Sequence, residues 1–114
     1  SDMTILNEHY TETDFRMVIF GPAISPAVFI GDQLYQVNMK IEAGEYVTID
    51  SSQGTIILTK TDGSRENAFN SREKEQNIFA RIPQGMSRVK WNGDFGFDII
   101  LFQERSQPRC AYKI

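Results

Sequence analysis

Apolar and polar side chains alternate along most of the chain with the two-residue period of half-buried β-strands. In residues 15–20, for example, Phe15, Met17 and Ile19 fall on one face of an extended segment. The pattern therefore predicts about eight strands separated by turn signals. They are expected at residues 15–20, 28–30, 33–35, 46–49, 55–59, 78–82, 86–91 and 97–102, the last of these being the final strand.

Dipeptides typical of tight turns join several of these segments. The Gly-Asp pair at 31–32 separates two expected strands by two residues, which is the spacing of a β-hairpin. The Asp-Gly pair at 62–63 ends the strand at 55–59 with a second hairpin-type turn. The Asn-Gly pair at 92–93 is the strongest turn dipeptide in the chain and predicts a third hairpin turn. Such turns indicate antiparallel neighbours.

One polar stretch departs from the alternation. Residues 64–76 are polar and are expected to connect two sheets. Asn70 and Ser71 are residue types that favour the N-terminus of a helix, so a short helical turn is expected at 72–75.

Composition supports a β fold. Ile, Val and Thr total 25 residues, Leu and Ala only 10, and 13 residues are aromatic, a balance that favours strands over helices. The 114 residues are one domain's worth of sequence. The predicted fold is all-β, an antiparallel β-sandwich of jelly-roll type. We expect this domain at residues 13–114, with residues 1–12 a leader or a vector-derived remnant, because Met3 is a candidate initiator.

Charge and cysteine usage exclude several functions. Twelve basic against 15 acidic side chains give a net charge of −3, which disfavours a nucleic-acid partner because phosphate binding needs clustered Lys and Arg. The single Cys110 cannot form an internal disulfide, and no Cys/His set suits zinc. No apolar run approaches the roughly 18 residues of a membrane helix, so no membrane partner is expected either.

Two pairs of carboxylates invite a glycosidase interpretation. Asp94 and Asp98 flank one short segment, and Glu42 and Glu45 flank another. Acidic side chains in turns are usually solvated, and neither pair has a neighbouring basic or metal partner that would separate the two pKa values. We therefore expect no enzyme, and no catalytic, cofactor-binding or metal residues.

Aromatic side chains near residues 92–93 form the remaining candidate site. Trp91, Phe95 and Tyr46 are able to stack on a sugar ring, with Asn92 and Asp94 as hydrogen-bonding partners. Trp91 falls on the apolar face of its strand and is expected in the core, whereas Phe95 lies in a loop. The candidate surface or glycan contact is therefore Asn92, Asp94 and Phe95.

Several stretches of the chain resemble siphophage distal tail proteins. The resemblance spans about residues 13–109 in order and spacing. Its sequences are EAGEYVTIDS at 42–51, IPQG at 82–85, VKWNGDFGFD at 89–98 and FQERSQP at 102–108, preceded by the segments 15–21 and 28–32.

The resemblance implies a specific architecture and role. In that family the matching region is the C-terminal β-sandwich, of galectin-like or carbohydrate-module-like shape, whereas the N-terminal half builds the ring that joins the tail tube to the baseplate hub. The implied function is a structural, peripheral domain of the distal tail ring, in the virion and, during assembly, in the bacterial cytoplasm. Its implied partners are other tail, baseplate or receptor-binding proteins, and the family supplies no catalytic residues.

A second class of function stays open beside this one. The alternative is a carbohydrate-binding module that contacts host cell-surface glycans, with weak glycan binding at Asn92, Asp94 and Phe95. In either case we expect the isolated domain to be a monomer, because the sequence shows no surplus apolar face beyond the alternating core positions.

Overall fold

The computed structural model describes residues 2–102 and 108–113, with side chains described for residues 3–102. Within that part almost every element is a β-strand, and the helical structure consists of the short 3-10 turn η1 (Phe69–Ser71). Cys110 and residues 103–107 of the closing motif lie outside the range of described side chains.

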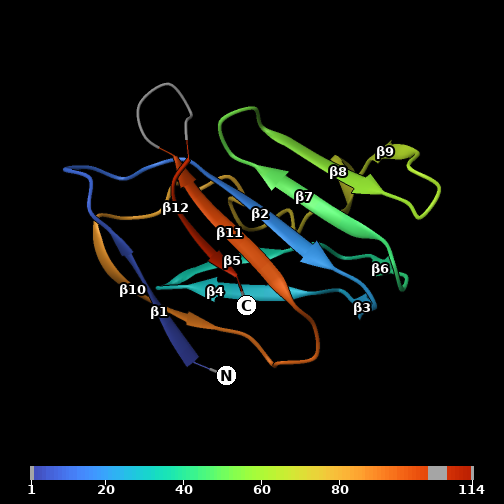
Figure 1. The fold of residues 1–114 in the computed structure, drawn as a ribbon, viewed down its shortest axis with the longest axis horizontal. Coiled ribbons are helices and arrows are strands. Elements are labelled where there is room, and N and C mark those ends of the chain that lie inside the picture. The colour runs from blue at the N-terminus through green and yellow to red at the C-terminus, as the bar shows by residue number, and fades with distance from the viewer. Residues whose placement is uncertain (1, 103–107, 114) are drawn as a thin grey trace.

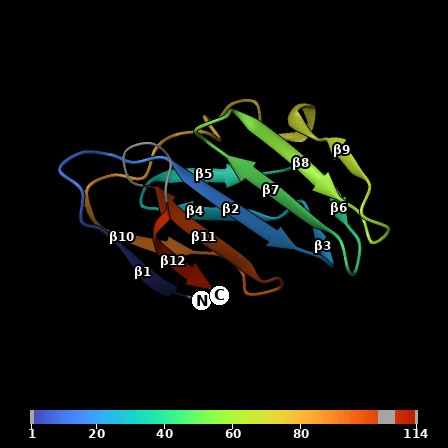
Figure 2. The same ribbon diagram turned by 45° about the horizontal axis from the view of Figure 1, so that its top comes forward.

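Two antiparallel sheets pack face to face, with the strands of one crossing those of the other (Figures 1 and 2). The four-stranded sheet has the order β1 (Asp2–Asn7), β10 (Gly85–Lys90), β4 (Ala27–Ile30) and β5 (Gln33–Gln36). The six-stranded sheet has the order β12 (Pro108–Lys113), β11 (Phe97–Phe102), β2 (Phe15–Phe20), β7 (Tyr46–Asp50), β8 (Thr55–Thr59) and β9 (Arg65–Asn67). A small sheet pairs β3 (Ala23–Ile24) with β6 (Lys40–Ile41). The predicted all-β, antiparallel sandwich is confirmed.

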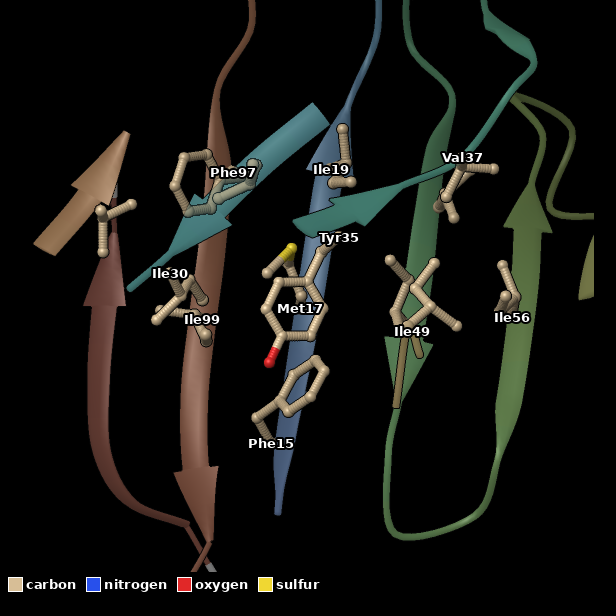
Figure 3. Close-up of a cluster of buried hydrophobic side chains, with 14 of the residues drawn as sticks. Phe15, Met17, Ile19, Ile30, Tyr35, Val37, Ile49, Ile56, Phe97 and Ile99 are labelled. Carbon is tan, nitrogen blue, oxygen red and sulfur yellow. The ribbon is translucent and has the colours of Figure 1, made fainter. Parts of the chain in front are cut away.

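The core lies between the two sheets and is built from alternate strand positions. In β2, Phe15, Met17 and Ile19 are fully buried, as the alternation predicts. Figure 3 shows Tyr35 of β5 lying across β2. Its ring packs edge-on against the Phe15 ring, with 5.1 Å between the ring centres. The Tyr35 hydroxyl donates a hydrogen bond to the Ala80 carbonyl at 2.6 Å, and burial raises the pKa of this phenol above its ordinary value.

Two of the three predicted hairpin turns are confirmed. The turn at residues 31–32 joins β4 to β5, which pair from Ile30 and Gln33 outward. Residues 62–63 lie in the turn between β8 and β9, which are also neighbours. Gly63 has a φ of +87°, a left-handed conformation that favours glycine.

The third hairpin prediction, at residues 92–93, is wrong. Gly93 does adopt a left-handed φ of +84°, so a turn is present. However, β10 belongs to the four-stranded sheet and β11 to the six-stranded sheet. The Asn-Gly turn therefore carries the chain from one layer of the sandwich to the other.

The structure also differs from the expected domain start at residue 13. Residues 2–7 form β1, an edge strand that pairs with β10 along its whole length. Ile5 is fully buried in the core, so this segment belongs to the sandwich rather than to a leader outside it. At the other end, β12 pairs with β11, so residues 97–102 are not the last strand.

Residues 72–75 do not form the expected helical turn. The turn lies earlier, at η1, where the Phe69 amide donates to Asn67 Oδ1 at 2.9 Å. Arg72 instead forms an isolated β-bridge with Val37, and its guanidinium lies 3.9 Å over the Phe69 ring centre. The polar stretch connects the two sheets as expected, but as β9, η1 and turns.

Residues 78–82 do not form the expected strand either. The Phe79 amide donates to Asn77 Oδ1 at 3.1 Å and the Ala80 amide to the Asn77 carbonyl at 3.1 Å, so the chain turns here instead of continuing as a strand. Only Ile82 is paired, through an isolated bridge with Thr13. The apolar pattern of this segment reflects burial of Ile78 and Ile82 without sheet pairing.

Candidate functional site

The loop between β10 and β11 carries the three residues that the sequence assigns to a surface contact. The Asp94 amide donates to Asn92 Oδ1 at 3.0 Å, and the Trp91 indole Nε1–H donates to the Phe95 carbonyl at 3.2 Å. Trp91 is half-buried rather than fully in the core, and its ring meets Phe97 edge-on at 5.0 Å. These contacts hold the loop in one conformation against the core.

Asn92, Asp94 and Phe95 lie together on one hollow of about 280 Å³. The opposite wall is the small sheet of β3 and β6, which contributes Ile24, 78% exposed, and Lys40. The structure thus brings the three predicted residues to one place. Phe95 is half-buried, however, and its ring packs against Phe97 at 6.2 Å rather than standing free in solvent.

Two further hollows adjoin the first along the four-stranded sheet. Asn92 also lines a hollow of about 330 Å³ whose walls include Trp91, Phe29 and Lys90. Phe29 and Lys90 in turn line a third hollow, of about 590 Å³, together with Arg88 and Asp32. Neighbouring hollows share these residues and follow one another from the loop onto the sheet, and we call the three together the trough.

Most of the trough lies on the outer face of the four-stranded sheet, the side turned away from the core. Exposed apolar side chains gather here: Phe29 is 43% exposed, Leu6 44% and Met86 69%. Leu6 and Met86 are directly opposite each other in the β1–β10 pair. The cations Arg88 and Lys90 lie on the same face of β10 as Met86. The outward-facing strand residues with described side chains are Thr4, Leu6, Ala27, Phe29, Leu34, Gln36, Met86, Arg88 and Lys90.

The outer face of the six-stranded sheet carries carboxylates as well as aromatic and basic side chains. Phe20 and Tyr46 form an exposed aromatic pair there, with ring centres 6.1 Å apart. Carboxylates accompany them on this face: Asp50 pairs with Arg16 at 3.4 Å, and Asp98 lies opposite Val18. Tyr46 packs on Phe20, whose amide donates to the Gly96 carbonyl at 3.0 Å, but Tyr46 does not line the hollow of Asn92, Asp94 and Phe95.

The Glu42–Glu45 pair stabilises a turn and has a basic neighbour. Glu45 accepts a hydrogen bond from the Glu42 amide at 2.9 Å, which closes the turn before β7. The Glu42 carboxylate lies 3.7 Å from Lys40 Nζ. Among residues 2–102 and 108–113, no group of three or more His, Cys, Asp and Glu side chains is placed to hold a metal ion. No helix in that part is long and apolar enough to cross a bilayer.

The sequence alone did not assign Phe29, Arg88 and Lys90 to a site. Their alternation showed that Arg88 and Lys90 share a face with Met86, but not that Phe29 of β4 lies opposite Lys90. Comparison with protein-family models, curated proteins and solved structures gives no match for this chain. The features that bear on function are therefore the resemblance of its motifs and the geometry of the trough and the two sheet faces.

Proposed function

We propose that the chain is a structural module of a phage or prophage tail. It is a peripheral domain of the distal tail ring, at the junction of tail tube and baseplate, and presents a surface to baseplate or receptor-binding proteins. Its sandwich is of the jelly-roll or galectin-like type, it acts in the virion, and it is assembled in the bacterial cytoplasm. It carries no catalytic role.

One observation supports this proposal above the others. The stretches that resemble distal tail proteins fall on consecutive parts of one sandwich: residues 15–21 contain β2, 28–32 begin the β4–β5 hairpin, and 42–51 contain β7. Residues 89–98 contain the crossing loop between the sheets. A resemblance carried by framework strands and their connections is of the kind that preserves a fold and the surface it presents.

The geometry of the outer faces supports a role in contacts rather than in chemistry. A rigid sheet that exposes Phe29, Met86 and Arg88 has the residue types enriched in protein interfaces. The trough is open and shallow, whereas small-molecule sites are usually enclosed pockets with convergent polar groups. A module of this kind binds neighbouring proteins through a face.

Labelling of tail particles tests the proposal. Antibodies raised against the chain are expected to decorate particles from the encoding phage or lysogen at the distal end of the tail, where tube and baseplate meet. Tape-measure and tail-fibre genes are expected beside the gene. Particles that carry no label at the tail tip, from a gene outside any tail cluster, would contradict the proposed function.

The alternative, a module that binds host cell-surface glycans, is favoured by one feature. Asn92, Asp94 and Phe95 share a hollow, so amide, carboxylate and aromatic groups face one volume. The half-buried Phe95 ring offers no flat exposed platform, so we expect no tight binding of common cell-wall saccharides. Saturable binding at micromolar saccharide that is lost in Phe95→Ala would favour the glycan module instead.

A further inference from the structure

The turn between β10 and β11 holds the Asn-Gly pair of residues 92–93 at the surface, where the chain crosses between the sheets (Figure 1). Asn92, Gly93 and Asp94 are all exposed to solvent. Asn92 Oδ1 accepts a hydrogen bond from the Asp94 amide at 3.0 Å, so the Asn92 carboxamide is folded over the peptide that follows it. The electrophilic carbon of this side chain, Cγ, is therefore held near the backbone of Gly93.

The Gly93 amide nitrogen is the nucleophile that follows this carboxamide in the chain. Among the residues that the structure describes, no acceptor receives a hydrogen bond from it. Gly93 also has no Cβ to obstruct the approach of its nitrogen to Asn92 Cγ, and it adopts its φ of +84° without steric cost. The Asp94 N–H lies where negative charge develops on Oδ1 during such an attack, as a donor in an oxyanion hole does. Three consecutive residues thus supply the electrophile, the nucleophile and the donor that stabilises the developing charge.

The neighbouring asparagines of the structure lack parts of this arrangement. Asn67 and Asn77 form the same side-chain turn with the amide two residues later. However, the amide that follows Asn67 donates to the Ile56 carbonyl at 2.8 Å, and Asn77 is followed by the buried, β-branched Ile78. The amide that follows Asn70 is hydrogen-bonded in the turn of η1 at 2.9 Å. Each of these nitrogens is either occupied by a hydrogen bond or obstructed by a side chain.

We infer that Asn92 is a site of spontaneous deamidation in the folded protein. The Gly93 nitrogen loses its proton to solvent and attacks Asn92 Cγ, so that a nitrogen–Cγ bond forms, the Cγ–Nδ2 bond breaks and ammonia leaves. Water then opens the resulting cyclic imide. Attack of water at Cγ gives aspartate, whereas attack at the main-chain carbonyl carbon gives isoaspartate, whose backbone runs through Cγ. The overall reaction consumes one water, releases one ammonia and needs no enzyme, oxidant or cofactor.

Both products alter the surface at the candidate contact residues. Asn92 lines one hollow with Asp94 and Phe95. Deamidation replaces its N–H donors by a carboxylate and makes the net charge of −3 one unit more negative. Isoaspartate also adds a methylene to the backbone of the loop that the 3.2 Å hydrogen bond from Trp91 to the Phe95 carbonyl closes. The charge and the shape of this loop therefore change with the age of the protein, whatever its function.

Ageing of the purified chain at physiological pH and temperature, followed by peptide mass spectrometry, tests the inference. We expect the peptide that contains residues 92–93 to gain the mass difference between an amide and a carboxylate. Isoaspartate is identified in this peptide by its resistance to a protease that cleaves at aspartate. Asn67, Asn70 and Asn77 in the same sample are internal controls and are expected to stay intact over the same period.

Two glycine variants form a matched pair. Gly93→Ala is expected to slow deamidation of Asn92 about tenfold or more, which corresponds to about 1.4 kcal/mol of activation free energy, because the new Cβ obstructs the attacking nitrogen. Gly63→Ala introduces the same kind of strain in another turn, since Gly63 has a φ of +87°, and should leave the rate at Asn92 unchanged. Circular dichroism checks that both variants are folded.

Ageing in urea separates the effect of the loop from that of the sequence, and it requires no variant. Unfolding frees the amide that follows Asn70, so Asn70 is expected to deamidate faster in urea than in the folded chain. Asn92 is expected to react in the folded chain at no less than about a tenth of its rate in urea. Slower reaction of Asn92 than this would overturn the inference, as would equal rates at Asn67 or Asn77, or equal rates at Asn92 in folded Gly93→Ala and Gly63→Ala.

Discussion

Asp50 is a carboxylate that fixes the turn between β7 and β8. Its side chain is only 7% exposed. Oδ1 accepts hydrogen bonds from the Ser52 amide at 3.0 Å, the Ser52 hydroxyl at 2.7 Å and the Gln53 amide at 3.2 Å. Oδ2 lies 3.4 Å from Arg16 Nε on the neighbouring strand. One side chain thus satisfies two backbone donors and holds β2 to the turn.

Asp50→Ala is expected to lower the free energy of unfolding by about 1–3 kcal/mol, because it removes the acceptor of two backbone amides in the turn. Asp50→Asn keeps one carbonyl oxygen and should cost less. Urea denaturation followed by tryptophan fluorescence measures both changes. The control is Asp62→Ala, since Asp62 is an exposed carboxylate that accepts from the Ser64 amide at 2.8 Å. An equal loss in the two alanine variants would contradict the role assigned to Asp50.

Trp91 links the crossing loop to the core. Trp91→Ala is expected to cost about 2–3 kcal/mol, less than the roughly 3–5 kcal/mol of a fully buried aromatic, because the ring is half-buried against Phe97. Trp91→Phe keeps an aromatic ring but removes the Nε1–H donor to the Phe95 carbonyl, and should cost about 1 kcal/mol. Because both variants lose the indole, their urea midpoints are read by circular dichroism. An unchanged midpoint in Trp91→Ala would show that the ring does not stabilise the fold.

At the scale of elements, the sequence predicts strands where the determining interactions are local. Alternation and turn dipeptides are sufficient to locate β2, β11 and the hairpin of β4 and β5. They cannot decide which sheet a strand joins, since pairing depends on segments far apart in the chain. For this reason the turn at 92–93 is recognised as a turn, but its crossing between the layers is not.

The same limit applies to the candidate site. Asn92, Asp94 and Phe95 could be grouped from the sequence because they are neighbours in one loop, and the structure places them on one hollow. Phe29 reaches the trough only because β4 pairs with β10, about 60 residues later in the chain. No local pattern carries that information.

The contribution of strand β1, residues 2–7, to stability can be tested by mutation. Ile5→Ala is expected to lower the free energy of unfolding by about 2–4 kcal/mol, because Ile5 is fully buried between β10 and the core. Thr4→Ala, on the exposed face of the same strand, should change it by less than about 0.5 kcal/mol. Chemical denaturation of both variants measures the difference. If neither variant changes the free energy of unfolding, residues 2–7 do not belong to the part of the chain that unfolds cooperatively.

At the scale of the whole molecule, the two sheets present unlike surfaces. The outer face of the six-stranded sheet carries the exposed aromatic pair of Phe20 and Tyr46. The outer face of the four-stranded sheet instead exposes Phe29 and Met86, with Arg88, Lys90 and Asp32 lining one hollow beside Phe29. The core that supports both faces is shared, so a change on one face need not alter the other.

The same surface properties predict the state of association. The radius of gyration is 13.3 Å, close to the roughly 13 Å expected for a compact single domain of this length. The outer face of the four-stranded sheet is not continuously apolar, because Arg88 and Lys90 lie among its exposed apolar side chains, and burying unpaired cations in an interface carries a desolvation cost. We therefore expect a monomer at micromolar concentration, measured by light scattering and X-ray scattering. A stable hexamer of the isolated chain would contradict this and would mean that the sandwich itself carries the ring interface.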